Sequence, residues 1–156
     1  MPKDHSYAIT VEWTGNRGEG TKDYRAYSRD HEIRGAGKII AGSSDTAFRG
    51  DAQRFNPEEL LVSTLSSCHM LWVLHLCAEA GIVVTSYADE ASGTMRENAD
   101  GSGEFLEATL RPRMTITDFT RIMDAMEIHD KAHQLCFIAR SVKFPVHHEP
   151  VIVPED

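Results

Sequence analysis

Hydrophobic residues recur at helical spacing over two long stretches of the chain. In residues 57–80, apolar positions follow one another every three or four residues, which predicts one face of an α-helix. That face consists of Leu61, Leu65, Cys68, Trp72 and Leu76. Residues 118–135 show the same spacing, and this stripe ends on a cysteine. It consists of Ile122, Met126, His129, His133 and Cys136. Two cysteines on the inner faces of two helices are able to meet.

The ends of the first helix carry clear signals. Asn56 is a favoured N-cap residue, Pro57 suits the first helical position, and Glu59 stands three residues after the cap. Gly81 is a natural stop, so we expect a helix of about 24 residues, roughly 36 Å long. The segment between Leu71 and Leu76 is apolar on most sides, which predicts a buried helix.

Strands are predicted before, between and after the helices. They cover residues 7–13, 24–28, 32–40, 82–96, 104–116 and 141–147. Residues 43–55 are predicted to form a polar loop, residues 98–103 a hairpin turn, and residues 150–156 a tail. Thr117 is expected to cap the second helix. The order of strands, long helix, hairpin, helix and strand predicts an α+β fold with antiparallel strands.

Composition narrows the class of protein. The chain has 156 residues, 41% hydrophobic content and a net charge of −8, which is typical of a globular domain and opposes binding to nucleic acid or anionic lipid. No apolar run follows the first five residues, and no stretch is expected to reach the roughly 18 apolar residues of a membrane span. Three cysteines without a CxxC spacing suggest neither a disulfide framework nor a zinc ribbon. We therefore expect a cytoplasmic protein that has reduced thiols and does not associate with a membrane.

Cys68 admits two interpretations. Most cysteines in apolar helices are small core residues. A reactive thiol here needs a cation from elsewhere, since burial raises a thiol's pKa and a mid-helix position lacks the positive dipole end. Arg29, Arg49 and Arg54 are the candidates for that cation. Cys77 falls on roughly the opposite side of the helix and is predicted to lie in the core.

Cys136 also admits more than one role. Alone it is expected to be structural, whereas beside an oxidised Cys68 it is able to act as a resolving thiol. His129, His133 and Cys136, with Cys68 as a fourth ligand, form a weaker metal-site alternative that lacks the glutamate of His-Glu-x-x-His. His69 and His75 are predicted to be structural or hydrogen-bonded core residues.

Several of these features together resemble the OsmC/Ohr family of thiol peroxidases. The resemblance rests on the run from Asn56 to Leu60, on Cys68 in the same helix, and on the segment from Ala132 to Cys136 with its following strand. Gly93 and Gly103 in the hairpin also fit. The likeness spans about residues 5–150, which implies a single OsmC-like domain over residues 1–156. It implies an intertwined α+β homodimer in which sheets wrap two central helices and the active sites lie at the subunit interface.

The resemblance also implies a chemistry and its residues. Cys68 corresponds to the peroxidatic cysteine, Cys136 to the resolving cysteine, Glu58 to the family glutamate, and Arg29 to the family arginine. The implied activity is reduction of organic hydroperoxides. No bound cofactor is expected, and an external dithiol, of the lipoyl or thioredoxin type, is expected to reduce the resulting disulfide.

Two features bear on how this chain carries out that chemistry. Glu58 and Cys68 lie ten residues apart, or about 15 Å in a continuous helix, so one arginine does not easily reach both. Either the helix is irregular near Glu58 or a partner subunit supplies a residue. Met70 and Trp72 are expected to give a bulkier or flatter apolar pocket. The alternative function is a dimer of the same fold that binds an apolar small molecule without turning over peroxide.

Overall fold

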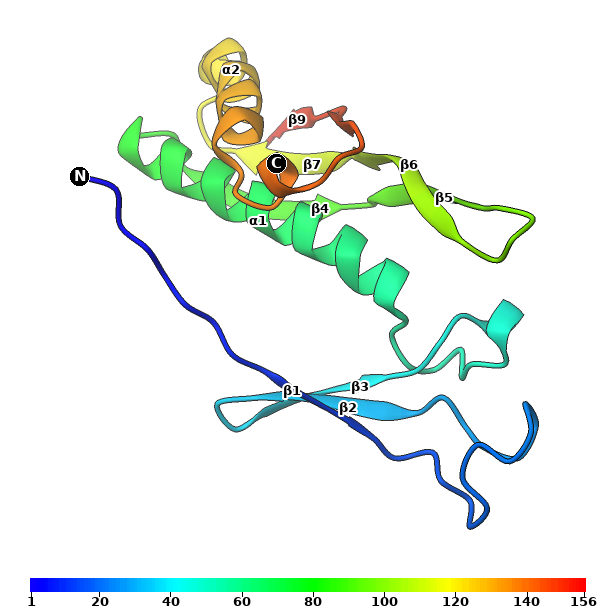
Figure 1. The fold of residues 1–156 in the computed structure, drawn as a ribbon. Coiled ribbons are helices and arrows are strands. Elements are labelled where there is room, and N and C mark those ends of the chain that lie inside the picture. The colour runs from blue at the N-terminus through cyan, green and yellow to red at the C-terminus, as the bar shows by residue number, and fades with distance from the viewer. The chain divides into compact units, whose positions relative to one another are not determined.

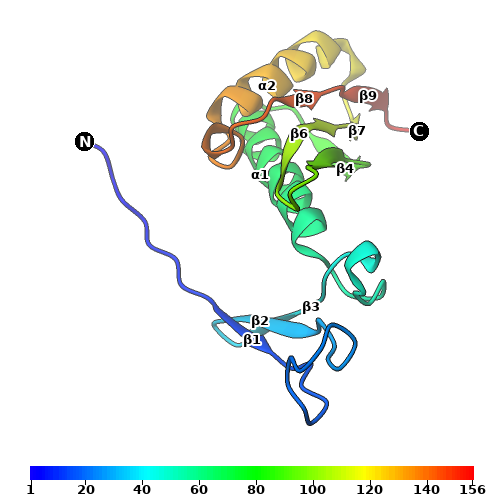
Figure 2. The same cartoon turned by 45° about the vertical axis from the view of Figure 1, so that its right-hand side comes forward.

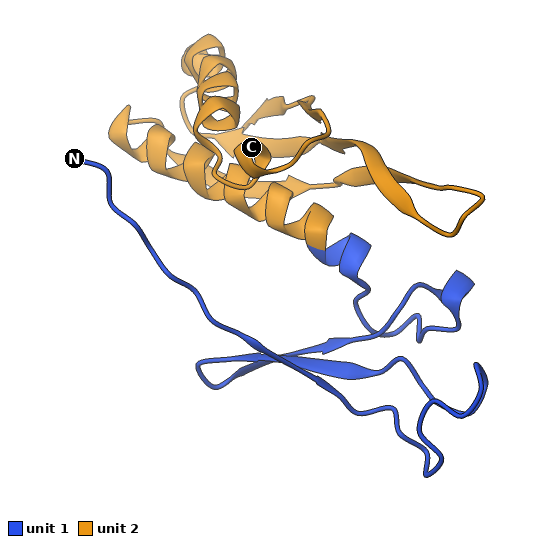
Figure 3. Cartoon of the chain, in the orientation of Figure 1, with its two compact units in different colours: residues 1–60 blue, residues 61–156 orange.

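The computed structural model describes all of residues 1–156. The chain divides into two compact units, Met1–Leu60 and Leu61–Asp156, which Figure 3 colours separately. The boundary falls in the first turn of a long helix that belongs mainly to the second unit. That residues 1–156 form a single domain stays a prediction, because two compact units within a chain can belong to one domain or to two.

The first unit is built on a three-stranded antiparallel sheet. Its strands are β1 (Thr10–Trp13), β2 (His31–Gly35) and β3 (Lys38–Gly42), paired in that order. The predicted strand over residues 32–40 is in fact the β2–β3 hairpin. Ala36 and Gly37 turn the chain there with φ values of 49° and 78°, a combination that tight hairpins require.

The predicted strand over residues 24–28 is wrong. This segment forms turns and bends, in which the backbone N–H of Ala26 donates to the carbonyl of Asp23. The Asp23 carboxylate also accepts a hydrogen bond from the backbone N–H of Arg25. Aspartate readily closes such turns, and this local pairing outweighs the β-propensity of the tyrosines. The predicted polar loop over residues 43–55 is present and includes the short 3-10 helix η1 (Thr46–Phe48).

Apolar side chains of the first unit are exposed. Those on the sheet are Val11, Trp13, Ile39 and Ile40, with exposed fractions of 42–61%. No hydrophobic residue among residues 1–60 belongs to the buried core. A sheet with apolar side chains needs a covering layer to gain stability from burial, and the first unit by itself contains none.

The second unit contains the predicted long helix, α1 (Pro57–Glu79). The Asn56 side chain accepts from the backbone N–H of Glu59 at 2.8 Å, and the Glu59 carboxylate accepts from that of Asn56 at 3.1 Å. This reciprocal pair is the predicted capping box. Gly81 takes a φ of 71° beyond the last turn, and the N–H of Ile82 donates to the carbonyl of Cys77. Both predicted ends of the helix are confirmed.

The prediction that α1 is a buried helix holds for only one of its faces. Leu65, His69 and Val73 are buried, but Leu71 is 62% exposed and His75 is also exposed. The helix therefore has one face in the core and one apolar face that the chain leaves open. The expectation that no segment is apolar enough for a membrane span also fails. By length and mean hydropathy alone α1 passes that test, as core helices of soluble proteins also do.

The predicted hairpin after α1 is present, but each of its arms is broken into two strands. The first arm comprises β4 (Val84–Asp89) and β5 (Ser92–Glu97), and the second comprises β6 (Gly103–Leu110) and β7 (Pro112–Ile116). The break lies where the backbone N–H of Arg111 donates to the carboxylate of Asp89. As a result, the two arms contribute to two sheets, one containing β4 and β7 and the other β5 and β6.

The structure of the C-terminal segment differs from two predictions. The last predicted strand is shorter than expected, since η3 (Ala139–Ser141) precedes β8 (Val146–His148). The predicted tail contains a further strand, β9 (Val151–Pro154). Strands β8 and β9 pair in parallel with β6 and β7, so the fold class α+β is confirmed but the sheets are mixed.

The core of the second unit lies between its helices and its strands. The second helix consists of η2 (Phe119–Arg121), capped by Asp118 and not by Thr117, followed by α2 (Ile122–Leu135). Helices α1 and α2 lie on the same side of the strands (Figures 1 and 2). Val73, Met114 and Ala125 are fully buried in the layer where α1, β7 and α2 meet. This packing brings the inner faces of the two helices together, as their stripes predict.

Candidate functional site

The two helices bring Cys68 and Cys136 together. Cys68 is half-buried on α1, while Cys136 is 1% exposed and ends α2, where its ψ of 114° turns the chain out of the helix. Both thiols are free, and the Cys68 side chain lies close enough to Cys136 to shift the pKa of its thiol. Burial raises the pKa of the Cys136 thiol to about 11. The neighbouring Cys68 side chain also raises this pKa, and a backbone hydrogen bond from Ala139 acts against the rise. The pair therefore joins an accessible thiol to a buried, protonated one.

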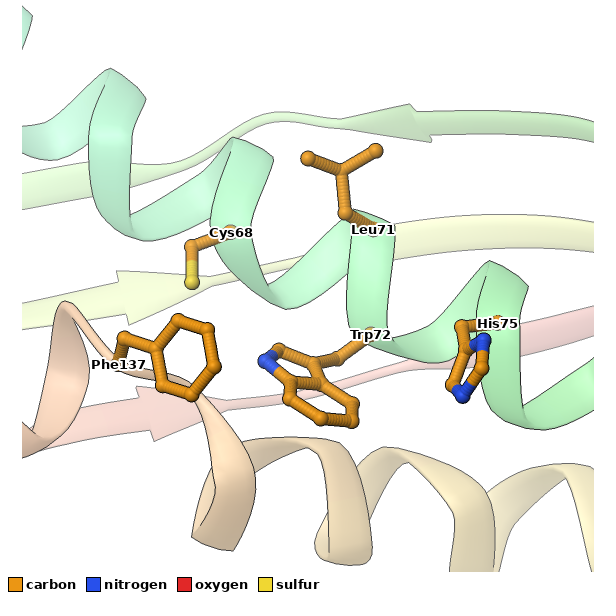
Figure 4. A pocket seen from close by; sticks show the side chains of 5 residues that line it. All are labelled: Cys68, Leu71, Trp72, His75 and Phe137. Atoms are coloured by element: carbon orange, nitrogen blue, oxygen red, sulfur yellow. The ribbon is translucent and has the colours of Figure 1, made fainter. Parts of the chain in front are cut away.

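Cys68 opens into an apolar pocket. The pocket has a volume of about 340 Å³, and Figure 4 shows the side chains that surround it. They are Cys68, Leu71, Trp72, His75 and Phe137. The predicted contribution of Trp72 to a flat apolar pocket is confirmed, whereas Met70 does not line it. Phe137 follows Cys136 directly, so the pocket and the thiol pair are parts of one site.

Aromatic contacts order the wall of the pocket. The Trp72 ring meets the Phe137 ring edge to face, with centroids 5.5 Å apart and an interplanar angle of 81°. On its other side it meets His75 at 5.8 Å and 82°. His75 Nε2 lies 3.6 Å from a carboxylate oxygen of Glu79. Edge-to-face pairs have a preferred geometry, so these contacts hold the indole in a defined orientation.

Cys77 does not take part in this site. It is 1% exposed within the core shared by α1, α2 and the β4–β7–β9 sheet. Burial raises the pKa of its thiol to about 11, which keeps it protonated. The prediction that Cys77 is a core residue is confirmed.

Arg29 and Glu58 are not brought together within the chain. The Arg29 guanidinium lies over the rings of Tyr24 and Tyr27, 4.3 and 4.0 Å from their centroids, and donates to both of their backbone carbonyls. Glu58 lies in the first turn of α1 and forms no ion pair in the structure. The expected bidentate pair between these two residues is therefore not formed within one chain. The helix is continuous from Pro57, which removes the possibility of an irregular segment near Glu58.

The other two candidate cations also lie in the first unit. Arg54 Nε lies 3.5 Å from the Asp30 carboxylate, and its guanidinium donates to the carbonyl of His31. Arg49 is exposed and holds a left-handed backbone with a φ of 64° at the end of η1. No arginine or lysine lines the pocket beside Cys68.

A buried pair of histidines lies beside the thiols; His69 is the hydrogen-bonded core residue that was predicted, but its pairing with His129 was not predicted. His69 and His129 are 1% and 0% exposed, and His69 Nε2 lies 3.0 Å from His129 Nδ1. The remaining ring nitrogens, His69 Nδ1 and His129 Nε2, have no hydrogen-bond partner. His69 directly follows Cys68, and His129 lies on the stripe of the second helix that ends at Cys136. These positions were the only signal in the sequence that the two rings could meet. No group of three His, Cys, Asp or Glu side chains is arranged to hold a metal ion, so the metal alternative finds no support.

Further polar groups border this pair. The His148 ring lies 5.6 Å from the His69 ring and 5.0 Å from the His133 ring, and it contacts the Asp130 carboxylate at 2.8 Å. Burial, with a smaller contribution from neighbouring imidazoles, lowers the pKa of His69 to about 3 and that of His129 to about 4. The buried pair is therefore neutral and shares a single proton across its hydrogen bond.

Comparison with known protein families assigns the chain. A family model described as OsmC-like protein matches residues 50–150, which is most of the chain. The chain belongs to the OsmC-like family. This result confirms the family resemblance and the fold class. Comparison with curated, characterised proteins finds no match.

Solved structures of OsmC-like proteins resemble the whole chain. An OsmC-like protein of unknown function from Vibrio cholerae is 30% identical, with a TM-score of 0.86 over 95% of this chain and 100% of that one. An organic hydroperoxide resistance protein from Elizabethkingia anophelis is 16% identical, with a TM-score of 0.67 over 98% of this chain and 100% of that one. A protein of the same description from Legionella pneumophila is 12% identical, with a TM-score of 0.64 and coverage of 97% and 98%. The last two likenesses concern the fold alone.

The difference in burial predicts selective alkylation. Under mildly alkaline conditions iodoacetamide is expected to modify Cys68 first, because thiolates react and the pKa of both Cys77 and Cys136 is raised to about 11. Peptide mass spectrometry after brief exposure measures the order. Denatured protein, in which all three thiols should react alike, is the control. Faster modification of Cys136 or Cys77 in the native protein would contradict the assignment.

The buried histidines predict a loss of stability in mild acid. Their folded pKa values, about 3 and about 4, lie below the ordinary value of 6.5, so the unfolded chain binds more protons below that pH. Stability is therefore fully retained above pH 6.5 and declines as the pH falls toward 4, by up to about 1.4 kcal/mol per pH unit for each ring. Urea unfolding between pH 7 and pH 5 measures the slope. The double variant His69→Leu/His129→Leu is expected to flatten it, and an equally steep slope in that variant would refute the assignment.

Proposed function

We propose that this protein reduces organic hydroperoxides by a two-cysteine mechanism. The observation that supports this most strongly is the contact between a half-buried Cys68 and a buried Cys136 at an apolar pocket. Two relatives of the same fold are described as organic hydroperoxide resistance proteins. An apolar pocket beside a thiol suits a peroxide with an organic group better than hydrogen peroxide, because burying that group is favourable.

The two thiols suit different steps. In the first, the Cys68 thiolate attacks the terminal peroxide oxygen, a sulfur–oxygen bond forms, the oxygen–oxygen bond breaks, and an alkoxide leaves. Cys68 is then a sulfenic acid, and the alkoxide takes a proton to become the alcohol. In the second step Cys136 attacks the Cys68 sulfur, water leaves, and a disulfide forms. Because Cys136 is buried and protonated, it is protected from peroxide until Cys68 has reacted.

The thiolate of Cys68 needs a positive charge that the pocket does not contain. We place Arg29 in that role, supplied by a second copy of the chain and oriented by Glu58. Ten residues of continuous helix separate Glu58 from Cys68 by about 15 Å, so the two residues of one chain do not flank one guanidinium. A guanidinium beside Cys68 would favour its thiolate and the negative charge on the leaving oxygen.

The same second copy accounts for the uncovered apolar surface. Val11, Trp13 and Ile39 on the first unit's sheet are exposed, and so is Leu71 on α1. Large exposed apolar areas mark interfaces, and a homodimer would bury them. In this proposal the homodimer is therefore required both for folding of the first unit and for catalysis.

The remaining requirements of the cycle lie outside the chain. The mechanism uses no bound cofactor, because the electrons pass through the thiol pair. A dithiol of the lipoyl or thioredoxin type reduces the disulfide by thiol exchange. Such a cycle fits the reducing cytoplasm, where Cys77 would also remain a thiol.

A second function is supported by the pocket itself. Its volume of about 340 Å³ lies in the range of small-molecule sites, and its lining is largely apolar. The alternative is a dimer that binds an apolar small molecule and leaves Cys68 reduced. Binding of that kind would survive Cys68→Ser, whereas peroxide turnover would not.

Peroxide consumption by the reduced protein tests the proposed function. Cumene hydroperoxide is expected to react faster than hydrogen peroxide, with loss of two thiols per chain. Cys68→Ser is expected to abolish the reaction, and Cys136→Ser to stop it after one turnover at the sulfenic acid. The alternative function would be favoured if all three thiols of the wild type persisted in excess cumene hydroperoxide.

Complementation between inactive subunits tests the shared site. Cys68→Ser and Arg29→Ala are each expected to be inactive as homodimers. Refolding the two together at equal amounts is expected to restore about a quarter of wild-type activity, since half of the dimers then contain one complete site. Mixing without refolding is the control. Two inactive parents that yield no activity after verified subunit exchange would refute the assignment of Arg29 to the partner.

A further inference from the structure

The indole of Trp72 lies next to Cys68 in the pocket, with its nitrogen on the side of the thiol. The two residues are four positions apart on α1, and helical side chains lean toward the N-terminus, so the indole leans over the turn that carries the thiol. Figure 4 shows the indole nitrogen on the side of the ring that faces Cys68 and Phe137. The polar edge of this aromatic ring is therefore directed at the thiol end of the pocket.

The direction of that edge is fixed by its neighbours. The indole is held between Phe137 and His75 by two nearly perpendicular ring contacts, at 5.5 and 5.8 Å between centroids. His75 Nε2 in turn lies 3.6 Å from a carboxylate oxygen of Glu79. A donor that is already oriented costs no reorganisation when charge appears beside it.

The indole N–H of Trp72 has no acceptor in the structure. The chain's other tryptophan, Trp13, donates its N–H to the carbonyl of Ser28 at 2.8 Å. No hydrogen bond of this kind is formed by Trp72. Among the other residues that line the pocket, Leu71 and Phe137 lack polar side-chain atoms, and His75 lies on the far side of the indole from Cys68. Trp72 is thus the nitrogen donor nearest to the thiol among the pocket residues.

We propose that Trp72 is a catalytic residue that donates a hydrogen bond to the leaving oxygen of the hydroperoxide. This inference rests on the proposed function. As the Cys68 sulfur donates an electron pair to the terminal oxygen, the oxygen–oxygen bonding pair moves to the inner oxygen, which becomes an alkoxide. Sulfur is oxidised by two electrons and the peroxide is reduced by two. The indole keeps its proton, and water supplies the proton that converts the alkoxide to the alcohol.

The benefit of this hydrogen bond grows during the reaction. In the bound hydroperoxide the inner oxygen is a weak, neutral acceptor, whereas in the transition state it carries developing negative charge. A donor that binds the charged oxygen more strongly than the neutral one lowers the barrier and not merely the Kd. The flat ring of Trp72 at the same time leaves the organic group of the substrate against Leu71 and Phe137.

The variant Trp72→Phe separates the N–H from the ring. Its rate constant for cumene hydroperoxide is expected to fall about tenfold, the typical effect of one hydrogen bond to a partly exposed charged oxygen. The loss is expected to be largest for tert-butyl hydroperoxide, whose alkoxide is a poor leaving group, and smallest for a peroxy acid, whose carboxylate is a good one. The pH titration of the Cys68 thiolate, followed by its ultraviolet absorbance, is expected not to move.

A closer isostere shows whether a loss of rate in Trp72→Phe comes from misfolding or from the missing N–H. Benzothienylalanine at position 72 replaces the indole N–H with sulfur and keeps the bicyclic shape, and its unfolding transition should match that of the wild type. It should reproduce the leaving-group dependence seen for Trp72→Phe.

Two outcomes would refute the role of Trp72 and leave the proposed function intact. One is an active wild type with unchanged rates in both variants. The other is an equal loss for all peroxides together with a shifted Cys68 titration, which would mean that the indole acts on the thiolate. A wild type that consumes no peroxide would instead refute the proposed function, and this inference with it.

Discussion

The packing of α1 against α2 is the constraint on which the rest of the structure depends. It buries two imidazoles, His69 and His129, in a direct hydrogen bond and places Cys68 and Cys136 in contact at the end of α2. The interior of this contact is polar, although Val73 and Ala132 nearby are fully buried. Buried polar pairs specify one alignment of two helices more strongly than interchangeable aliphatic residues do. The histidine pair therefore helps to keep the two thiols in register.

Sequence reasoning worked best where local rules act. The capping box at Asn56 and Glu59 and the stop at Gly81 fix α1 through contacts within a few residues, so its ends were predictable. The meeting of Cys68 and Cys136 was also accessible, because each lies on the apolar stripe of its helix. These stripes must pack together to bury their surface, whatever the details of the fold.

Sequence reasoning failed where residues far apart in the sequence pair with one another. Residues 150–156 were predicted to form a tail without a strand assignment, but Val151–Pro154 pairs in parallel with β7. Short apolar segments do not indicate which distant strand they pair with. His69 and His129 are separated by 60 positions, so their pairing required the helix register in three dimensions. The exposure of Leu71 arises for another reason, since a periodicity that predicts burial does not say whether the covering surface belongs to the same chain.

The central claim is that Cys68 and Cys136 form one redox pair, and peptide mapping after a single equivalent of cumene hydroperoxide tests it most directly. The reduced protein is treated, remaining thiols are blocked, and non-reduced peptides are analysed by mass spectrometry. The account predicts a Cys68–Cys136 disulfide within each chain, with Cys77 recovered as a blocked thiol. A disulfide that includes Cys77, or complete recovery of Cys68 and Cys136 as blocked thiols, would contradict it.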